Sequence, residues 1–414
     1  MGWVESCRRG VIEFRTGPKA REKTGDQKSM KTFRSILLVA GFLVGGLQLL
    51  SAADMVFTPT NPPGMTPISS HDTAAYRAAK LFQHGVNLGD YLEDRYLGPK
   101  MAAEEFVEMK RQGFDHVRVP VGWQHYAGPA PDFTLSPEIF ARVDDAVTNT
   151  LANGMAVMIN IHHFDELDHD PAGATEEYLA IWRQIAAHYR DYPEQLAFEL
   201  DNEPHENAKT AVMNPIYARV IEEIRASNPN RTIIVEPGGW GSIGELKNLV
   251  LPPDENVIVS IHCYDPFHFT HQGASWTSED VQQTNIVFPG PPTVPLVPDA
   301  RLKPQQWVLD WIKKYNTLPT DRNPSGPAAF RGELRYVHDW SEYYGRPVHL
   351  GEFGAYTKAD ERSRANFYAA MRQTAEKDGI GWCIWDWSAG FRYWDRKKHA
   401  PMPGMHEALF GGSK

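Results

Sequence analysis

Cysteine and positive charge are both scarce in this sequence. Its 414 residues include three cysteines, Cys7, Cys263 and Cys383, and no C-x-x-C pair. So few thiols indicate neither a disulfide framework nor a cysteine-based zinc or redox site. Lys and Arg number 42 against 52 Asp and Glu, which gives a net charge of −10. Because binding to nucleic acid needs clustered Lys and Arg, we expect no nucleic-acid partner.

The apolar run near the N-terminus is too short to span a membrane. Residues 36–50 (ILLVAGFLVGGLQLL) follow a basic stretch and precede Ser51-Ala52-Ala53. A spanning helix needs ~20 apolar residues, whereas this arrangement is typical of a secretory signal peptide. We therefore predict cleavage near Ala53, a secreted or periplasmic location, and no membrane contact after cleavage. An uncleaved anchor is the alternative, and Met30 is interpreted as the true start of the protein.

Beyond residue 80, short β-branched and aromatic runs alternate with amphipathic patterns. The predicted strands are 82–88, 114–121, 155–162, 196–202, 231–236, 257–264, 347–353 and 380–387. The predicted helices include 100–112, 137–153, 175–190, 212–228, 328–345 and 360–378. Eight strands that alternate with helices predict an α/β protein of one domain, a (β/α)8 or TIM barrel.

A long insertion follows the sixth predicted strand. Residues 265–327 are rich in Pro and carry one helical pattern near 303–316. An insertion after the C-terminal end of a strand lies on the catalytic face of a barrel, so we expect it to shape a cleft. A surface excursion without function is the alternative. We divide the chain into an N-terminal extension with a signal peptide (1–53), an extended lead-in (54–79) and the barrel (80–414).

Polar and aromatic residues gather where six of the predicted strands end. These residues are Arg118, His162-His163, Asn202-Glu203, His262 with Tyr264, Glu352, and Trp385. The C-terminal ends of parallel strands meet at one rim, where barrel enzymes keep their active sites. Packing alone does not explain six such ends.

Glu203 and Glu352 end the fourth and seventh strands and are predicted to face each other across the barrel mouth. Glycoside hydrolysis uses two carboxyl groups: one with a raised pKa protonates the leaving oxygen, and an ionised one attacks the anomeric carbon. A separation of ~5–5.5 Å gives retention of configuration, and ~6.5–9.5 Å gives inversion. The alternative for either residue is a buried ion pair, which we expect for Glu199 deeper in strand four.

Seven short runs follow one another along residues 80–411. They are Gly85-Val-Asn-Leu-Gly89, Arg118-Val-Pro120, Asn160-Ile-His-His163, Phe198-Glu-Leu-Asp-Asn-Glu-Pro204, Ser260-Ile-His-Cys-Tyr264, Gly351-Glu-Phe-Gly354 and Trp385-Asp386. In this order and spacing they resemble glycoside hydrolase family five, the large cellulase family. With residues 266–276 (PFHFTHQGASW), the pattern is most similar to bacterial endoglucanases that also act on β-mannans.

The resemblance implies a role for each matching position. It implies that Glu203 is the general acid/base and Glu352 the nucleophile. Four residues would support them: Asn202 on the sugar 2-hydroxyl, Arg118 and Tyr264 on either side of Glu352, and His262 beside Glu203. The substrate would be bound by His162, His163, Trp385, Trp276, Asp90 and Glu93. For Trp123 and Trp240, core or lid packing is as good an explanation as sugar stacking.

A metal site is the competing hypothesis for the histidines. Adjacent strand residues point to opposite faces, so His162 and His163 should not both aim inward unless the strand has ended. The sequence offers no further ligand that would complete a binuclear site. We therefore expect no metal and no cofactor.

Two positions depart from the family pattern. Asp201 stands where an apolar residue is usual before Asn202, and the parity of the strand places it beneath Glu203. A carboxylate there would raise the pKa of Glu203 or its own pKa. Asp90 stands where relatives carry Asn, and a carboxylate can only accept hydrogen bonds, so the substrate contact near Glu93 would differ.

Together these inferences predict a retaining, endo-acting hydrolase of β-1,4-glucan, including mixed-linkage glucan, with β-mannan or glucomannan as further substrates. The partner is a polysaccharide or oligosaccharide, and the protein is expected to be a monomer. An exo-β-glucosidase or a xyloglucanase on the same site depends on whether residues 265–327 close one end of the cleft. A non-catalytic carbohydrate-binding barrel is the contrasting class, and a metal-dependent amidohydrolase is a third.

Overall fold

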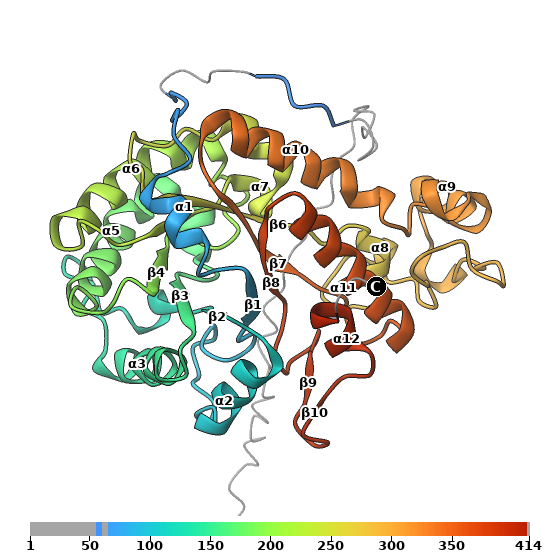
Figure 1. Cartoon of the computed structure of the whole chain (residues 1–414), viewed down its shortest axis with the longest axis horizontal. Helices are drawn as coiled ribbons and strands as arrows, with labels where there is room; N and C mark the ends of the chain where they lie inside the picture. The colour runs from blue at the N-terminus through green and yellow to red at the C-terminus, as the bar shows by residue number, and fades with distance from the viewer. Residues whose placement is uncertain (1–54, 60–64, 412–414) are drawn as a thin grey trace, which may run out of the picture. The chain divides into compact units, whose positions relative to one another are not determined.

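A closed barrel of eight parallel strands forms the centre of the protein (Figure 1). The computed structural model describes residues 55–59 and 65–411. The strands are β1 His84–Asn87, β2 His116–Val119, β3 Ala156–Asn160, β4 Leu196–Glu199, β5 Ile233–Val235, β6 Val257–His262, β7 Val348–Phe353 and β8 Gly381–Ile384. The predicted (β/α)8 fold is confirmed. The predicted signal peptide, its cleavage site and Cys7 lie outside the described residues.

Helices surround the barrel and mostly follow the amphipathic segments of the sequence. They are α1 Ala74–Ala79, α2 Ala103–Gln112, α3 Pro137–Ala152, α4 Asp165–His169, α5 Pro171–His188, α6 Thr210–Ser227, α7 Gly238–Gly241, α8 Phe267–Thr270, α9 Gln306–Thr317, α10 Ala328–Tyr344, α11 Glu361–Lys377 and α12 Met405–Phe410. A small hairpin of β9 Trp394–Asp395 and β10 Ala400–Pro401 follows β8. Among the described residues, no helix is both long and apolar enough to cross a bilayer.

One part of the predicted lead-in is wrong. Residues 54–79 were expected to be extended, but α1 forms at their C-terminal end because the side chain of Thr73 accepts a hydrogen bond from the backbone of Tyr76 and caps an Ala-rich turn. Ala75 of this helix then packs with Phe82 into an apolar cluster whose other buried members are Ala156, Met158, Ala197, Ile234 and Ile258. The segment before the barrel therefore contributes to its core.

Most strands end earlier than the sequence pattern predicts. The predicted strand 196–202 stops at Glu199, 155–162 stops at Asn160, and 380–387 stops at Ile384. A few residues beyond two of these ends the backbone turns: Glu203 has a φ of 52° and His163 a φ of 55°. Residues with positive φ cannot continue a β ladder, so the polar residues of the rim leave the sheet.

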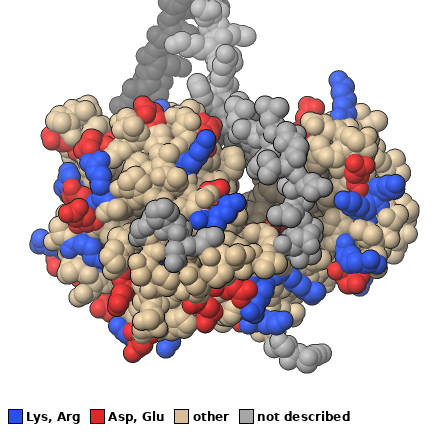
Figure 2. Space-filling view, turned by 90° about the horizontal axis from the view of Figure 1, so that it is seen from above, with Lys and Arg blue, Asp and Glu red and all other residues tan. Residues whose placement is uncertain are grey.

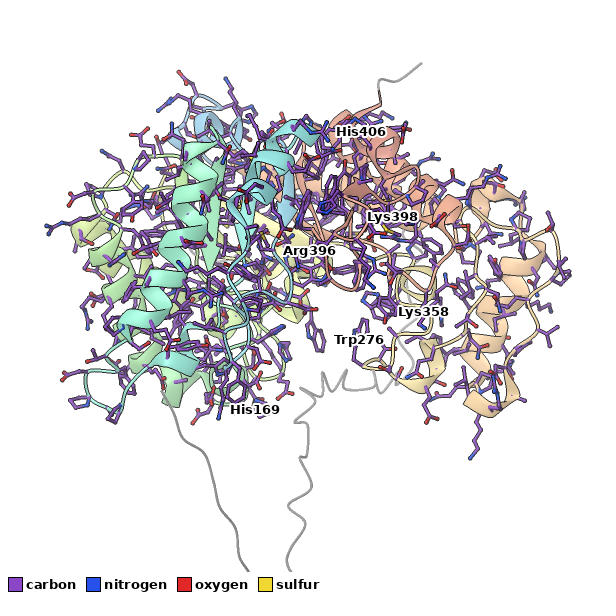
Figure 3. The ribbon with its side chains drawn as sticks, turned by 90° about the horizontal axis from the view of Figure 1, so that it is seen from below. His169, Trp276, Lys358, Arg396, Lys398 and His406 are labelled. Atoms are coloured by element: carbon purple, nitrogen blue, oxygen red, sulfur yellow. The ribbon has the colours of Figure 1, made fainter. Side chains whose placement is uncertain are left out.

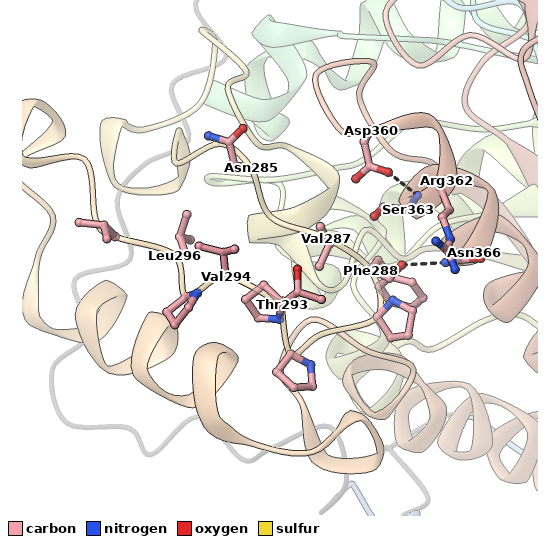
Figure 4. A pocket seen from close by; sticks show the side chains of 15 residues that line it. Asn285, Val287, Phe288, Thr293, Val294, Leu296, Asp360, Arg362, Ser363 and Asn366 are labelled. Atoms are coloured by element: carbon pink, nitrogen blue, oxygen red, sulfur yellow. Dashed lines mark hydrogen bonds between the residues drawn. The ribbon is translucent and has the colours of Figure 1, made fainter.

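The insertion after β6 contains α8, α9 and three 3-10 turns, η4 Glu279–Val281, η5 Ala300–Leu302 and η6 Thr320–Arg322. Figure 3 shows Trp276 at its edge. A hollow of about 700 Å³ lies between this insertion and the start of α11, with Phe288, Val294 and Asn366 in its lining (Figure 4). None of the predicted site residues lines it.

Candidate active site

A layer of mainly polar side chains occupies the C-terminal interior of the barrel. Every second residue of a strand points into the barrel. The inward residues near the N-terminal ends of the strands, such as Ala156 and Ile234, are apolar, and those of the same strands near the C-terminal ends are polar. The residues of this layer are Asn87, Arg118, Asn160, Glu199, Glu236, His262 and Glu352. On the face shown in Figure 2, by contrast, acidic and basic side chains are interspersed over the surface.

Two irregularities in strand pairing aim the residues of β6 and β7. The register between β6 and β7 shifts after Ile261, so that His262 pairs with Glu352. The register between β7 and β8 shifts between Leu350 and Phe353. Such bulges redirect side chains next to active sites. As a result, His262 Nδ1 lies 3.7 Å from Glu352 Oε2.

Arg118 joins the elements of the site from below. It is fully buried and makes a two-pronged ion pair with Glu199, at 2.6 and 3.1 Å. It also donates to Glu352 Oε1 at 2.7 Å, to Asn202 Oδ1 at 2.7 Å and to Asn87 Oδ1 at 2.9 Å. The expected contact of Arg118 with Glu352 is present. Glu199 also forms the buried ion pair that was expected of it, and its partner is Arg118.

Both carboxylate oxygens of Glu352 accept hydrogen bonds. Arg118 contacts Oε1, and the Tyr264 hydroxyl donates to Oε2 at 2.7 Å. Burial raises the pKa of Glu352, while the charges of His262 and Arg118 act in the opposite direction. The donors on both oxygens partly offset the effect of burial and fix the orientation of the carboxylate.

Glu203 is held differently. Its Oε1 lies 2.8 Å from His262 Nδ1, its backbone N–H donates to Glu236 Oε2 at 2.9 Å, and its side chain is 19% exposed against 5% for Glu352. One oxygen of Glu203 and one of Glu352 lie within 4.8 Å of each other. The two carboxyl groups therefore converge, with Glu203 the more open of the pair.

The expected raised pKa of Glu203 is not found. Burial acts to raise this pKa, but the hydrogen bond and the charge of His262 outweigh it, so the pKa of Glu203 is lowered. Burial opposes the charged form of His262, yet Glu236 and Glu352 raise the pKa of His262 well above its usual range. The proton available for acid catalysis is thus held by the Glu203–His262 pair as a unit.

The interior contains more carboxyl groups than cations. Arg118 and His262 lie among four carboxyl groups, those of Glu199, Glu203, Glu236 and Glu352. Burial raises the pKa of Glu199 to about 8, and the charge of Glu236 adds to this effect. The two-pronged ion pair with Arg118 acts in the opposite direction and lowers this pKa.

The residues predicted to bind sugar on the β1 and β3 side come together. His162 Nε2 and His163 Nε2 lie 4.0 and 3.9 Å from Glu93 Oε2, and Glu93 Oε1 accepts the backbone N–H of Asp90 at 2.8 Å. His162 is buried and His163 is partly exposed. Burial lowers the pKa of both imidazoles, so they are neutral and can donate to or accept from hydroxyl groups.

His162 and His163 meet the exception to strand parity, because both follow the end of β3. Because β3 ends at Asn160, both His162 and His163 approach Glu93, and the three side chains offer ligand atoms within 4.8 Å of one another. The side-chain amide of Asn160, however, donates to His162 Nδ1 at 3.3 Å, which leaves the proton of a neutral ring on Nε2, the nitrogen that faces Glu93. A protonated nitrogen cannot ligate a metal, so the arrangement suits hydroxyl recognition better.

The aromatic candidates separate into core and rim. Trp123 is fully buried and belongs to the core. Trp385 is partly exposed, and its ring lies parallel to that of His162 at 5.8 Å. Trp276 is partly exposed beside Tyr356 at 4.8 Å, and Trp240 stacks on His205 at 4.9 Å.

Of the two effects expected of Asp201, the rise in its own pKa is found and a rise in the pKa of Glu203 is not. β4 ends at Glu199, so strand parity no longer fixes the direction of Asp201. Burial raises the pKa of Asp201 well above its usual range, with Asp168 the first of the neighbouring charges. The charges that act most on Glu203 are instead those of His262, His163 and Arg118.

Glu236 and Asn87 were not identified from the sequence as site residues. Glu236 ends the predicted strand 231–236, and a carboxylate at the end of a barrel strand was a usable signal. Asn87 lies within the Gly85–Gly89 run and donates through its amide to the backbone oxygens of Gly351 and Ile384 at 3.0 and 3.1 Å. Asn87 thereby ties β1 to the strands that carry the rest of the site.

A parallel barrel with two converging carboxyl groups at its C-terminal end defines the class of protein, a glycoside hydrolase. The family model described as cellulase (glycosyl hydrolase family 5) matches residues 79–390. The chain therefore belongs to glycosyl hydrolase family 5, as the sequence motifs indicated.

Individual relatives agree with the family. The chain is 30% identical over 328 residues to Endoglucanase H of Acetivibrio thermocellus, which covers 78% of this chain and 31% of that protein. It is 30% identical over 373 residues to the Cellulase/esterase CelE of the same organism, which covers 84% of this chain and 40% of that protein. The chain thus spans well under half the length of these relatives.

Solved structures give the same picture. Two structures of Cel5A from Thermotoga maritima, one in complex with cellobiose and one with mannotriose, each superimpose with a TM-score of 0.71 at 32% identity. In both comparisons the match covers 81% of this chain and 100% of the solved chain.

Proposed function

We propose that the protein is an endo-acting β-1,4-glucanase that works with retention of configuration, with β-mannan or glucomannan as additional substrates. The observation that carries the proposal is the convergence of Glu203 and Glu352, whose nearest carboxylate oxygens lie within 4.8 Å. This proximity supports the shorter of the two carboxyl separations, the one that leaves no room for a water between nucleophile and sugar.

In this proposal Glu352 attacks the anomeric carbon while its charge is held by Arg118 and Tyr264. The bond to the leaving oxygen breaks, and the Glu203–His262 pair supplies the proton to that oxygen. A water then attacks the anomeric carbon, the ester bond to Glu352 breaks, and Glu203 takes a proton from that water. Asn202, held by Arg118, lies next to Glu203 in the chain and is positioned to bind the sugar 2-hydroxyl.

Sugar binding is assigned to the rim residues around this pair. His162, His163 and Glu93 present hydrogen-bonding groups, and the partly exposed ring of Trp385 offers an apolar face. Trp276, on the insertion, supports a role for residues 265–327 in substrate binding. The mannotriose complex of the Thermotoga maritima relative supports mannan as a second substrate, since a site that contacts the C2 hydroxyl loosely accepts both sugars.

A hydrolysis panel tests the proposal. Carboxymethylcellulose, mixed-linkage glucan, glucomannan, galactomannan and xyloglucan are incubated with the enzyme, and viscosity, reducing ends and product anomers (by NMR) are followed. Endo action lowers viscosity before reducing sugar accumulates, and retention gives the β-anomer first. Product that appears first as the α-anomer would contradict the retaining mechanism, and sugar release without loss of viscosity would favour an exo-glucosidase.

Two contrasting classes are separated by simple controls. If the protein is a non-catalytic carbohydrate-binding barrel, the wild type shows no turnover and the Glu352→Gln variant keeps the affinity for sugar. If it is an enzyme, the wild type turns over substrate and the Glu352→Gln variant loses that turnover. A metal-dependent hydrolase would be inactivated by chelators. We also propose, from the sequence pattern of residues 36–53, that the protein is secreted or periplasmic. As a separate proposal, it acts as a monomer. Fractionation of the producing cells and light scattering test these two points.

A further inference from the structure

Glu236 is a fully buried carboxylate that directly follows β5. Its two oxygens take different partners. Oε2 accepts the backbone N–H of Glu203 at 2.9 Å, while Oε1 lies 3.0 Å from His262 Nε2 and 3.4 Å from Arg118 Nη2. Glu236 therefore contacts both the backbone of the proposed acid/base and the imidazole that shares its proton.

His262 bridges the two glutamates through opposite ring nitrogens. Nδ1 lies 2.8 Å from Glu203 Oε1, and Nε2 lies 3.0 Å from Glu236 Oε1. The contact of Nε2 with Glu236 does not have the geometry of a hydrogen bond, so Glu236 acts on the ring mainly through its charge. A negative charge at one nitrogen favours the protonated ring and so strengthens proton retention at the other nitrogen.

The backbone near Glu236 is built for close approach. Gly241 adopts a φ of 65°, and a Cβ at this position would lie 3.0 Å from Glu236 Oε2 and 3.3 Å from the His262 ring. A side chain there would push the carboxylate and the imidazole apart. Glycine at 241 lets the α7 segment close over the Glu236–His262 contact.

Other charged and titratable groups also face Glu236. They are Arg118 from β2, Glu199 from β4, Asp201 after β4, His262 from β6 and Tyr217 from α6. Of these, Arg118 and His262 are the cations, and only His262 also touches the Glu203 side chain. The effect of Glu236 on proton transfer therefore passes through His262.

We propose that Glu236 is a positioning residue for acid/base catalysis: it anchors the backbone of Glu203 and, through His262, retains the proton that Glu203 delivers. In the first step this proton moves to the leaving oxygen as the glycosidic bond breaks. In the second step the oxygen of a water bonds to the anomeric carbon, the ester bond to Glu352 breaks, and a proton of that water passes to the pair. Glu236 itself touches no reacting atom. This inference rests on the proposed function.

The test compares two leaving groups in a Glu236→Gln variant. From a 2,4-dinitrophenyl cellobioside, dinitrophenolate leaves without protonation, whereas the phenol of a phenyl cellobioside leaves only when the acid protonates its oxygen. We expect kcat/KM of the variant to fall about tenfold to a hundredfold on the phenyl substrate and to change little on the dinitrophenyl substrate. The basic limb of the kcat/KM profile on the phenyl substrate should move down by about one pH unit or more, because the pair loses its proton more easily without the charge of Glu236.

Two further variants keep the test decisive. Glu245→Gln is the matched control, because Glu245 hydrogen-bonds Thr210 and Asn248 near the same segment and does not contact the pair; its kinetics should match wild type. Glu236→Asp keeps the negative charge, but its shorter side chain holds that charge farther from His262. This variant tests the proposal if Glu236→Gln does not fold. We expect it to lose rate selectively on the phenyl substrate, by less than the Gln variant.

Equal losses on both substrates with an unmoved basic limb would overturn the proposal and leave Glu236 a structural role. Adding Glu236→Gln to a Glu203→Gln background should cause little further loss on the phenyl substrate; a full additional loss would also overturn it. If the wild type hydrolyses neither aryl glycoside nor any polysaccharide of the panel, the proposed function itself fails. That outcome is recognised before any variant is made.

Discussion

Replacing Arg118 with Met should destabilise the protein in a manner that depends strongly on pH. Arg118 is fully buried, and its guanidinium contacts three carboxyl groups, those of Glu199, Glu352 and Glu236. Methionine fills part of the same volume without the charge. The variant therefore leaves buried carboxylates without their main cation, the costly way to break a buried ion pair.

The size of the effect follows from the proton balance. At pH 8 we expect a loss of about 3–5 kcal/mol in the free energy of unfolding. Burial already raises the pKa of Glu352 and Arg118 opposes this, so without Arg118 the folded pKa of Glu352 rises further above its unfolded value. The folded variant then binds more protons than the unfolded chain, and its stability falls as pH rises. One extra bound proton changes stability by about 1.4 kcal/mol per pH unit, or up to about 4 kcal/mol between pH 5 and pH 8.

Urea unfolding at pH 5, 6.5 and 8 measures this dependence, with Arg346→Met as the control. Arg346 is equally buried but donates to the backbone oxygens of Asp254 and Pro252, so its loss should cost a similar amount at each pH. For Arg118→Met we expect a loss of only about 1–2 kcal/mol at pH 5, from hydrogen bonds and packing. The same destabilisation at pH 5 and pH 8 would refute the proton argument.

Three other changes test the site. Glu352→Gln should lower kcat by about 10⁴-fold or more while calorimetry still detects oligosaccharide binding; residual turnover near wild type would exclude Glu352 as nucleophile. Tyr264→Phe removes one donor to Glu352 Oε2 and should lower kcat/KM by about 10- to 100-fold, and a change of less than twofold in steady-state kinetics would contradict that role. Asp201→Asn should raise Tm more at pH 8 than at pH 5. Burial raises the folded pKa of Asp201 above its unfolded value of about 3.9, so this carboxyl group costs the wild type stability as pH rises. The Asn variant has no such group and does not lose this stability. Calorimetric melts that show the same Tm change at both pH values would contradict it.

The sequence predicted the fold and most of the site because both depend on local regularities. Alternation along strands indicated which residues face inward, and the parallel topology of a barrel brings all C-terminal strand ends to one rim. Arg118, Asn202, His262, Tyr264 and Glu352 could therefore be grouped without coordinates. The same regularity failed at Asp201, because β4 had already ended at Glu199.

Tertiary structure alone decided how the charges pair. Arg118 and Glu352 are 234 positions apart in the chain, and their contact depends on the bulge that sets the register of β7 against β6. The contact of Glu236 with His262 and the lowered pKa of Glu203 both involve one imidazole, which lies between residues that follow β4 and β5. The sequence by itself determined which chemical groups reach the barrel mouth. Which carboxyl shares its proton with which neighbour depends on distances of a few ångströms between strands that the chain joins only through long connections, and no local pattern encodes those distances.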